Sequence, residues 1–285
     1  MRFAITVTDR YIGVLESLLD RAWRPLKIFT TVVDNRLHRN TAVIELARRR
    51  NVEVQISRLS ADNLRDLGQL GCEALIVASY RWRIGDWRPH LPRAVNFHPS
   101  PLPFGRGPYP LPAAILGQAR SWAVTCHKVE HEFDAGDILA SRDFPLGEHE
   151  DHDSLDLRVQ LAARQLSADV AEHFEAYWQG ARAQGSGTCF PSWTARERAL
   201  DFSRTVAELL RQVRAFGPLE CIARLNNTDF FVRRAVGWNE SHRVPVGTVT
   251  YINSLAMVVA AADGFIGLTE WSLIDQDRVT GTIRR

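Results

Sequence analysis

Three polar residues in the middle of the chain have side chains that could move a carbonyl group onto an amine. Asn96 and His98 are two residues apart, so in an extended segment both side chains point to the same face. Asp134 follows in a short acidic loop, residues 130–137. The amide can donate a hydrogen bond to a negative oxygen, the imidazole can accept a proton near neutral pH, and the carboxylate can orient the imidazole. An attacking amine is itself the nucleophile, so this chemistry needs no covalent enzyme intermediate.

The segment between these residues is built to hold them on loops. Prolines at 99, 101 and 103 forbid a helix after His98, and glycines at 105 and 107 free the backbone on both sides of Arg106. A helix over 113–118 and a strand over 123–129 are expected before the acidic loop. Taken singly, an Asn-x-His pair is usually a polar loop pair and an Asp before Ala-Gly a turn residue. Their combination and order favour a catalytic set.

The same segment resembles a known family. The sequence NFHPSPLP at 96–103, Arg106-Gly107, Val124-Thr125 and DAGDIL at 134–139 resemble, in this order, the signature of the folate-dependent formyltransferases. This family includes methionyl-tRNA formyltransferase, the sugar N-formyltransferases, glycinamide ribonucleotide transformylase and ornithine formyltransferases. The resemblance implies N10-formyltetrahydrofolate as cofactor and catalysis by Asn96, His98 and Asp134. It also implies an N-terminal Rossmann-like domain and a small OB-like C-terminal domain.

The resemblance also implies two binding sites. The pteridine ring of the folate is expected between the loop after Ala78 and the acidic loop, held mainly by backbone groups. The formyl acceptor is expected beside the Arg106-Gly107 segment, where Tyr109 replaces the usual small residue. The predicted cofactor residues are Ser79, Tyr80, Ile84, Val95, Phe133, Ala135, Gly136 and Asp137. The predicted substrate-binding residues are Arg106, Gly107 and Tyr109.

The composition of the chain excludes several classes of function. With 285 residues, 45% hydrophobic and 24% charged residues, it is typical of a globular protein of one or two domains. The net charge of +2 gives no general electrostatic case for nucleic-acid binding. Four cysteines without metal-ligand spacing predict reduced thiols and no metal site. The sequence has neither a signal peptide nor an apolar run of about 18 residues, so we expect a cytoplasmic protein without a membrane anchor.

The hydrophobic pattern of the first half predicts an α/β fold. Short apolar strands alternate with amphipathic helices, which indicates a parallel sheet with helices on both faces. Ligands of such sheets bind beyond the carboxyl ends of the strands, where Ser79, Asn96 and His98 are expected. The absence of a G-x-G-x-x-G or P-loop sequence agrees with a folate cofactor. The expected strands are 3–7, 28–33, 52–56 and 73–78, and the expected helices are 11–22, 44–50 and 61–70, the first capped by Thr8-Asp9.

The second half predicts a separate β-rich domain. A long helix over 154–177 is followed by a Gly-rich boundary at 180–187 and a helix over 206–216. Five short strands then read as a small OB-like barrel. These strands are expected at 220–225, 230–236, 247–252, 256–261 and 265–271. We therefore predict a catalytic domain over 1–183, a linker over 184–204 and an OB-like domain over 205–285.

The formyl acceptor is predicted from the short loop at 34–40, which replaces a long basic insertion. Methionyl-tRNA formyltransferases carry a long basic insertion where this chain has the short loop DNRLHRN at 34–40. We therefore expect a small-molecule amine, such as a nucleotide-linked amino sugar or hydroxyornithine. Methionyl-tRNA is the alternative, so tRNA remains a second candidate partner, and a formyltetrahydrofolate hydrolase or a non-catalytic folate-binding protein is less favoured. The C-terminal domain could position the acceptor or form a homodimer, and the sequence leaves both open.

Overall fold

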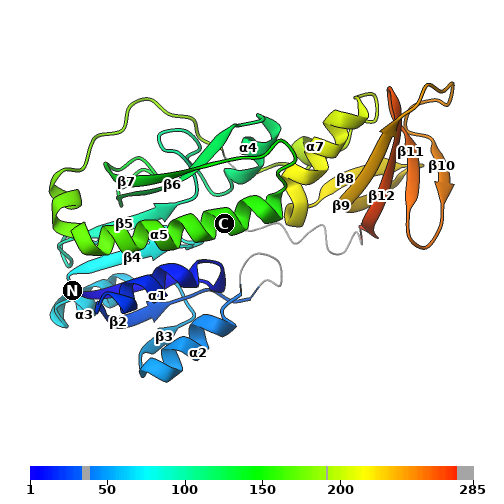
Figure 1. Cartoon of the computed structure of the whole chain (residues 1–285). Coiled ribbons are helices and arrows are strands. Elements are labelled where there is room, and N and C mark those ends of the chain that lie inside the picture. The colour runs from blue at the N-terminus through cyan, green and yellow to red at the C-terminus, as the bar shows by residue number, and fades with distance from the viewer. Residues whose placement is uncertain (34–38, 191, 275–285) are drawn as a thin grey trace. The chain divides into compact units, whose positions relative to one another are not determined.

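The computed structural model describes residues 1–33, 39–190 and 192–274, so most of the short loop at 34–40 lies outside the described residues. The chain forms two compact units (Figure 1). The first unit comprises residues 1–110, 121–145 and 156–190, and the second comprises 111–120, 146–155 and the chain from 191 onward. The predicted domain boundaries at 183 and 204 stay predictions, because compactness alone does not show where an independently folding domain ends.

The first unit is built on a seven-stranded sheet with the order β3-β2-β1-β4-β5-β6-β7. The pairs among β1 to β5 are parallel, whereas β6 and β7 run antiparallel to their neighbours. The predicted α/β fold is confirmed, and its sheet is mostly parallel. Strand β7, and β5 as a paired strand, were not predicted. The strands are β1 Arg2–Val7, β2 Arg24–Phe29, β3 Glu53–Gln55, β4 Ala74–Ala78, β5 Ala94–His98, β6 Ser121–Lys128 and β7 Ile138–Pro145.

The central strands are apolar because both of their faces are covered. All five residues of β4, the sequence ALIVA, are buried, as a parallel strand between helical layers requires. The helices of this unit are α1 Ile12–Asp20, α2 Thr41–Arg50, α3 Ala61–Gln69 and most of α5 His152–Gln179. Phe174 of α5 meets Trp23 edge to face at 5.3 Å between ring centroids.

Thr8 and Asp9 were predicted to cap the helix that follows them, and this prediction was wrong. Residues Asp9–Tyr11 form a short 3-10 turn before α1, and Thr8 makes no side-chain capping bond. The Asp9 carboxylate instead accepts a hydrogen bond at 2.9 Å from the backbone N–H of Val43, in the first turn of α2. A local pattern identified the capping residue, but tertiary contact decided which helix it caps.

The second unit is a five-stranded antiparallel sheet packed on one helix. The strand order is β10-β11-β12-β9-β8, and all five predicted strands are present. Helix α7 places Leu209, Val213 and Phe216 in the buried core against Val232 and Ile266. This unit contains α4 Leu111–Leu116, α6 Ala195–Arg198, α7 Val206–Phe216, a 3-10 turn Gly217–Leu219, β8 Cys221–Leu225, β9 Thr228–Asn239, β10 Val249–Ile252, β11 Met257–Ala260 and β12 Gly264–Leu273.

The described residues offer neither a membrane-spanning helix nor a cluster of metal ligands. None of the helices in the described ranges is both long and apolar enough to cross a bilayer. No group of three or more His, Cys, Asp or Glu side chains among these residues could hold a metal ion. Cys72, Cys126 and Cys221 are buried free thiols, and Cys189 is an exposed one.

Candidate active site

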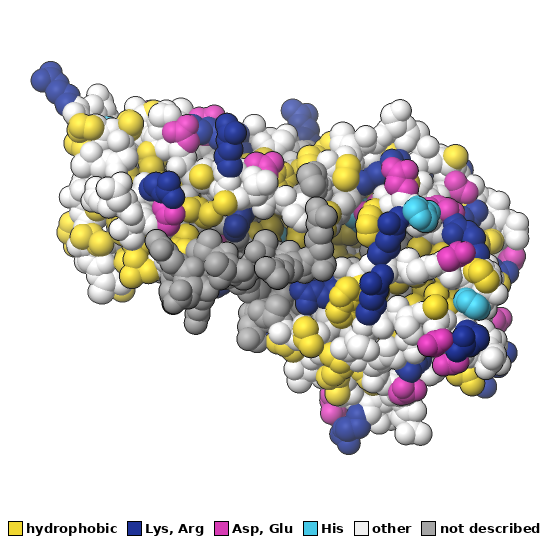
Figure 2. All heavy atoms as spheres, turned by 180° about the vertical axis from the view of Figure 1, so that it is seen from behind, with side chains coloured by type: hydrophobic (Ala, Val, Ile, Leu, Met, Phe, Trp, Pro, Cys, Tyr) yellow, Lys and Arg dark blue, Asp and Glu magenta, His cyan; other side chains and the backbone are white. Residues whose placement is uncertain are grey.

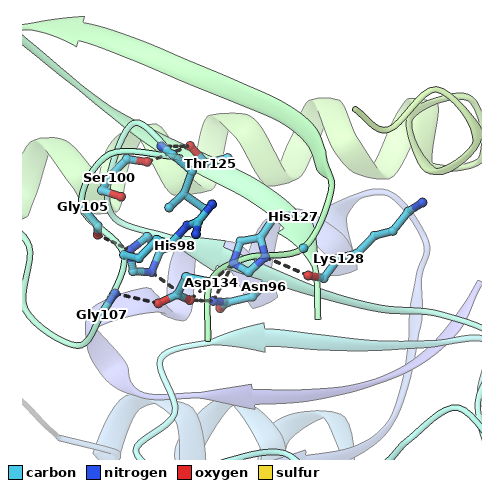
Figure 3. A network of polar contacts seen from close by, with 12 residues as sticks. Asn96, His98, Ser100, Gly105, Gly107, Thr125, His127, Lys128 and Asp134 are labelled. Carbon is cyan, nitrogen blue, oxygen red and sulfur yellow. Dashed lines mark hydrogen bonds and ion pairs between the residues drawn. The ribbon is translucent and has the colours of Figure 1, made fainter. Parts of the chain in front are cut away.

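The site forms where β5 ends beside β6, inside the first unit. Alternation along β5 turns Asn96 and His98 to one face, while Val95 and Phe97 are buried in the core. The antiparallel pairing places His127 of β6 opposite Asn96. Figure 3 shows Asn96, His98 and His127 gathered around Asp134 of the acidic loop. The structure therefore brings the three predicted catalytic residues together and adds a second imidazole.

Asp134 is the centre of this network. One carboxylate oxygen, Oδ1, lies 3.2 Å from Asn96 Nδ2, 3.3 Å from His98 Nδ1 and 3.5 Å from His127 Nε2. The other oxygen, Oδ2, accepts a hydrogen bond of 2.9 Å from the backbone N–H of Gly107. The Asp134 backbone has a φ of +54°, a left-handed conformation that aspartate tolerates better than most residues. One side chain thus holds groups from β5, β6 and the glycine-rich loop.

The protonation states follow from burial and charge. Burial alone would raise the pKa of the Asp134 carboxyl, but the nearby His98 and His127 imidazoles and the Gly107 N–H outweigh it and hold that pKa well below its usual value. For His98, burial is the largest effect and lowers the pKa, although the Asp134 charge and the Gly105 carbonyl oppose it. At neutral pH the site therefore contains a carboxylate and a neutral His98, the form that can accept a proton.

His98 has an acceptor on each side of its ring. Its Nδ1 faces the Asp134 carboxylate at 3.3 Å, and its Nε2 lies 2.8 Å from the Gly105 carbonyl oxygen. A neutral imidazole can donate to only one of these acceptors, whereas a charged imidazolium can donate to both. The surroundings of His98 therefore stabilise the charged form in a site where burial disfavours it.

His127 is the residue that the sequence analysis missed. Its Nδ1 lies 2.8 Å from the backbone oxygen of Lys128, which can only accept, so Nδ1 carries a proton. The other nitrogen, Nε2, then accepts a hydrogen bond of 3.1 Å from Asn96 Nδ2. The strand over 123–129 was predicted, but only its pairing with β5 reveals that His127 faces Asn96.

The two N–H groups of the Asn96 amide are both engaged. One points to the Asp134 carboxylate and the other to His127, at 3.2 and 3.1 Å. To stabilise a negative oxygen on a substrate, the amide must give up one of these contacts. Catalytic hydrogen bonds are often long in a structure without substrate and tighten only in the reactive complex, and both of these are long for their type.

The proline-rich loop is anchored from β6 and carries the Gly105 carbonyl. The Thr125 hydroxyl donates to the Ser100 oxygen at 2.7 Å and accepts from the Leu102 N–H at 3.2 Å. The predicted conformational freedom of the two glycines is used, with φ of +82° at Gly105 and +104° at Gly107. A Cβ on Gly107 would lie 2.2 Å from the Phe190 oxygen, so this position has no room for a side chain.

Arg106 and Tyr109, two of the predicted substrate-binding residues, already contact other parts of the first unit. The Arg106 guanidinium donates to Gln184 Oε1 at 2.9 and 3.2 Å and to the Gly185 oxygen at 3.1 Å. Gln184 in turn donates to the backbone oxygens of Asp134 and Gly136 at 2.9 and 2.6 Å. Tyr109 is half-buried and interacts electrostatically with Arg10. Of the three predicted residues, Gly107 alone touches the Asp134 network directly.

The two loops predicted to hold the pteridine lie against each other. The Trp87 indole N–H donates to the Val129 oxygen at 3.2 Å, and Arg83 bonds to both the ring nitrogen and the backbone oxygen of His131. The Arg83 guanidinium also lies 5.4 Å from the ring centre of Phe133, which is 62% exposed. The two loops therefore adjoin and present one exposed aromatic side chain.

The remaining predicted cofactor residues fall into two groups. Ser79, with a φ of +76°, hydrogen-bonds to Thr8, and the Tyr80 hydroxyl accepts the Leu59 N–H at 2.6 Å. Both are half-buried at the end of β4, together with Ile84, which packs beside Tyr80 on an apolar cluster. Val95 is fully buried, and its predicted place in a pteridine wall stays a prediction.

The acidic loop contributes backbone more than side chains. Gly136 approaches so closely that a Cβ would lie 1.9 Å from the Lys128 oxygen. The Asp137 carboxylate forms an ion pair with Lys128 Nζ at 3.2 Å. Ala135, between Asp134 and Gly136, is half-buried. These contacts fix the loop to the end of β6, and they leave the predicted binding roles of Ala135, Gly136 and Asp137 as predictions.

Comparison with known proteins agrees with this geometry. A model described as formyl transferase matches residues 30–170, and a model described as formyl transferase, C-terminal domain, matches residues 193–282. The chain belongs to the formyl transferase family. The predicted family is confirmed, and the two matches cover most of the described part of both units.

One curated relative is named methionyl-tRNA formyltransferase. Methionyl-tRNA formyltransferase of Treponema pallidum is 34% identical over 182 residues, which are 62% of this chain and 57% of that protein. The aligned region therefore spans little more than half the length of that relative.

Two solved structures have the same fold. An N-formyltransferase from Helicobacter canadensis, in complex with folinic acid and dTDP-3-aminofucose, has a TM-score of 0.69 at 15% identity and covers 95% of this chain and 99% of that chain. HypX from Aquifex aeolicus, in complex with tetrahydrofolic acid, has a TM-score of 0.66 at 20% identity and covers 98% of this chain and 47% of that chain. At these identities the likeness shows the fold alone.

Proposed function

We propose that this member of the formyl transferase family is an N-formyltransferase that moves the formyl group of N10-formyltetrahydrofolate to the amine of a small molecule. The observation that carries the proposal is the Asp134 carboxylate, whose Oδ1 lies within 3.3 Å of both Asn96 Nδ2 and His98 Nδ1. An amide donor, a neutral imidazole and an orienting carboxylate are what amine attack on a carbonyl requires.

The cofactor supplies a formyl carbonyl attached to a nitrogen leaving group. The residues that would hold it are those of the loops at 79–84 and 130–137, and they suit a flat aromatic ring with amide edges. Phe133 offers an exposed aromatic face, while Tyr80 and Trp82 stack edge to face at 5.3 Å on the other loop. The close backbone packing at Gly136 leaves main-chain groups as the polar partners of the ring.

In this proposal His98 takes the proton of the attacking amine. The Gly105 oxygen, 2.8 Å from Nε2, accepts the Nε2–H of the neutral imidazole, so Nδ1 is the nitrogen that takes the proton, and the Asp134 carboxylate at 3.3 Å stabilises the resulting imidazolium. The two acceptors thus stabilise the charge that appears as the proton moves, which lowers the barrier where burial alone would raise it. Asn96 donates to the developing negative oxygen after releasing His127, a contribution typical of about 3 kcal/mol.

The choice of a small acceptor rests on charge. A protein that grips tRNA must offer several cationic side chains to phosphates. In the second unit, however, many arginines are already ion-paired, and Figure 2 shows Lys and Arg side chains lying among Asp and Glu side chains on one face. The pairs are Arg204–Glu208 at 2.8 Å, Arg224–Asp229 at 2.7 Å, Arg233–Glu220 at 3.0 Å and Arg234–Glu270 at 3.4 Å.

Methionyl-tRNA is the second candidate acceptor, and one observation favours it. Curated relatives, including the Treponema pallidum protein, carry the name methionyl-tRNA formyltransferase. The family's chemistry would be unchanged, since only the carrier of the amine differs. A formyltetrahydrofolate hydrolase, in which water replaces the amine, is the less favoured alternative. We also propose that the protein is cytoplasmic and that its cofactor is a folate. The homodimer stays a prediction.

The deciding experiment measures formyl transfer to a panel of acceptors at two salt concentrations. The panel holds initiator methionyl-tRNA, nucleotide-linked amino sugars and hydroxyornithine, with purified N10-formyltetrahydrofolate as donor. We expect transfer to a small amine with little dependence on salt, and none to tRNA. Transfer to tRNA that weakens steeply with salt would establish the second candidate. Release of formate with every acceptor would indicate a hydrolase.

A further inference from the structure

The second unit contains a pocket that opens to solvent, called the cavity below. It has a volume of about 530 Å³ and is lined only by residues of that unit, from helix α4, helix α7 and the segment 146–150. Ile115 and Leu146 contribute apolar wall, and Arg120, Arg211 and Arg214 contribute guanidinium groups. None of the residues discussed for formyl transfer lines it, so the proposed function does not explain it.

Two of the arginines lie on one face of α7. Arg211 and Arg214 are three residues apart, which places them side by side on a helix. Burial lowers the pKa of the Arg214 guanidinium, and the charge of Arg211 lowers it further. The Arg214 Nε is buried and has no hydrogen-bond partner among the described residues. Two neighbouring like charges, one with a buried donor unused, form an arrangement that an anion would stabilise.

The cavity arginines differ from two other arginines of the unit, Arg204 and Arg224. Among the described residues, no side-chain hydrogen bond or ion pair engages Arg120, Arg211 or Arg214. By contrast, Arg204, on the turn that precedes α7, is paired with Glu208 at 2.8 Å, and Arg224 of β8 is paired with Asp229 at 2.7 Å. The three guanidinium groups at the cavity therefore have no side-chain partner among the described residues, while those of Arg204 and Arg224 are neutralised.

Two acidic residues also line the cavity and have to be accounted for. Glu150 is held locally, because its carboxylate accepts the Gly147 N–H at 3.3 Å and bonds to the Ser154 hydroxyl. Glu148 is exposed on the same segment. Asp151, outside the lining, acts electrostatically on Arg214. Three guanidinium groups against two carboxylates leave an excess of positive charge on the cavity wall.

We propose that this cavity binds a small molecule that carries a phosphate or diphosphate group. The forked guanidinium groups of Arg211 and Arg214 match phosphate oxygens in two directions, and Arg120 provides a third cation. The apolar wall at Ile115 and Leu146 contacts the organic part of the ligand. A volume of about 530 Å³ suits a ligand the size of a nucleoside diphosphate.

The test is isothermal titration of the full chain with uridine diphosphate and with inorganic pyrophosphate at constant ionic strength. The variant is Arg211→Gln with Arg214→Gln, and the matched control is Arg204→Gln with Arg224→Gln, which removes the same charge. We expect saturable binding by the wild type, at least tenfold weaker binding by the cavity variant and unchanged binding by the control. No binding by the wild type, or equal weakening in both variants, would overturn the proposal.

A second variant keeps the test valid if the double variant does not fold. Ala119→Phe fills the cavity without removing a charge, since Ala119 is a half-buried lining residue. Thermal unfolding establishes that it folds, and we expect it to abolish binding of uridine diphosphate. His98→Ala should bind with wild-type affinity. Wild-type binding by Ala119→Phe, or lost binding by His98→Ala, would show that the ligand is held elsewhere.

Discussion

The Asp134 site and the arginine cavity use charge in opposite ways. Around Asp134, the Asn96 amide and the Gly107 N–H donate to one carboxylate and the His98 imidazole lies beside it at 3.3 Å, so polar groups of the protein surround this buried charge. In the cavity, Arg211 and Arg214 lie beside each other, and the buried Arg214 Nε lacks a partner among the described residues. A compensated cluster fixes geometry for chemistry, whereas an uncompensated one favours an external ion.

This comparison predicts that removing one member of the compensated cluster has the largest effect. His98→Ala removes the group that takes the proton, and we expect turnover to fall by about 1000-fold, within the range typical of a lost general base. Single-turnover formyl transfer with a saturating acceptor measures the chemical step. His173→Ala is the matched control, because His173 is an exposed imidazole on α5. A loss below tenfold would remove His98 from the proton transfer.

Replacing the central carboxylate is expected to cost somewhat less. Asp134→Asn keeps the size of the side chain but loses the charge that orients His98, and we expect about a 100-fold fall in turnover. Asp143→Asn, at an exposed position of β7, is the control. Circular dichroism must show an unchanged fold for both variants. Equal rates for the wild type and Asp134→Asn would exclude the proposed orienting role.

The same variant gives a prediction for pH dependence. Burial lowers the pKa of His98, so kcat/KM should lose activity on the acid side only below about pH 6.5, the ordinary value for histidine. The Asp134 charge raises the pKa of His98, so its removal should move this acid limb to still lower pH. A limb that moves to higher pH in Asp134→Asn would contradict the assignment of His98 as the titrating base.

The free energy of unfolding should also depend on pH, in the direction set by the lowered pKa values of His98 and Asp134. A His98 whose pKa is lower in the folded state stabilises the protein fully above its unfolded pKa, and this contribution is lost as pH falls through about 6.5. The depressed pKa of Asp134 adds stability that is present above about pH 4 and lost in stronger acid. Urea unfolding of the wild type and Asp134→Asn at several pH values separates the two contributions.

The sequence predicts the compensated cluster better than the uncompensated one, for a physical reason. Asn96 and His98 share a face because side chains alternate along a strand with a period of two. Asp134 opens the sequence DAGDIL, which resembles part of the formyltransferase signature. His127 joins them only through the antiparallel pairing of β5 with β6, a long-range contact that local periodicity does not contain. The sheet was likewise predicted as parallel because the apolar runs do not encode the direction of β6 and β7.

The arginine cavity could not be predicted from local patterns at all. Arg211 and Arg214 belong to a predicted amphipathic helix whose apolar face was correctly assigned to the core, and no spacing in the sequence connects them to Arg120. The cavity exists because α4 and the segment 146–150, far apart in sequence from α7, belong to the same unit. Tertiary packing brought together charges that no sequence spacing connects.

The glycine-rich loop provides a prediction about the support of the cluster. Gly107→Ala places a Cβ at a φ of +104°, where it would lie 2.2 Å from the Phe190 oxygen. We expect a destabilisation of about 1–3 kcal/mol from the backbone strain and a loss of turnover of roughly tenfold, because the N–H that holds Asp134 shifts. Urea unfolding and initial rates measure both effects. Gly85→Ala, where a Cβ meets nothing within 4 Å, is the control and should change neither.

The smallest effect is expected at His127, the member of the cluster that organises without taking the proton. His127→Phe keeps a planar ring but removes the acceptor of the Asn96 amide, so the amide loses one of the two bonds that hold it. We expect a loss of turnover of a few-fold, about 1 kcal/mol for one lost hydrogen bond between neutral groups. The acid limb of the pH profile should persist, because His98 still titrates. A loss as large as that of His98→Ala would make His127 a second proton carrier, and the pair, rather than His98 alone, would then be the catalytic base.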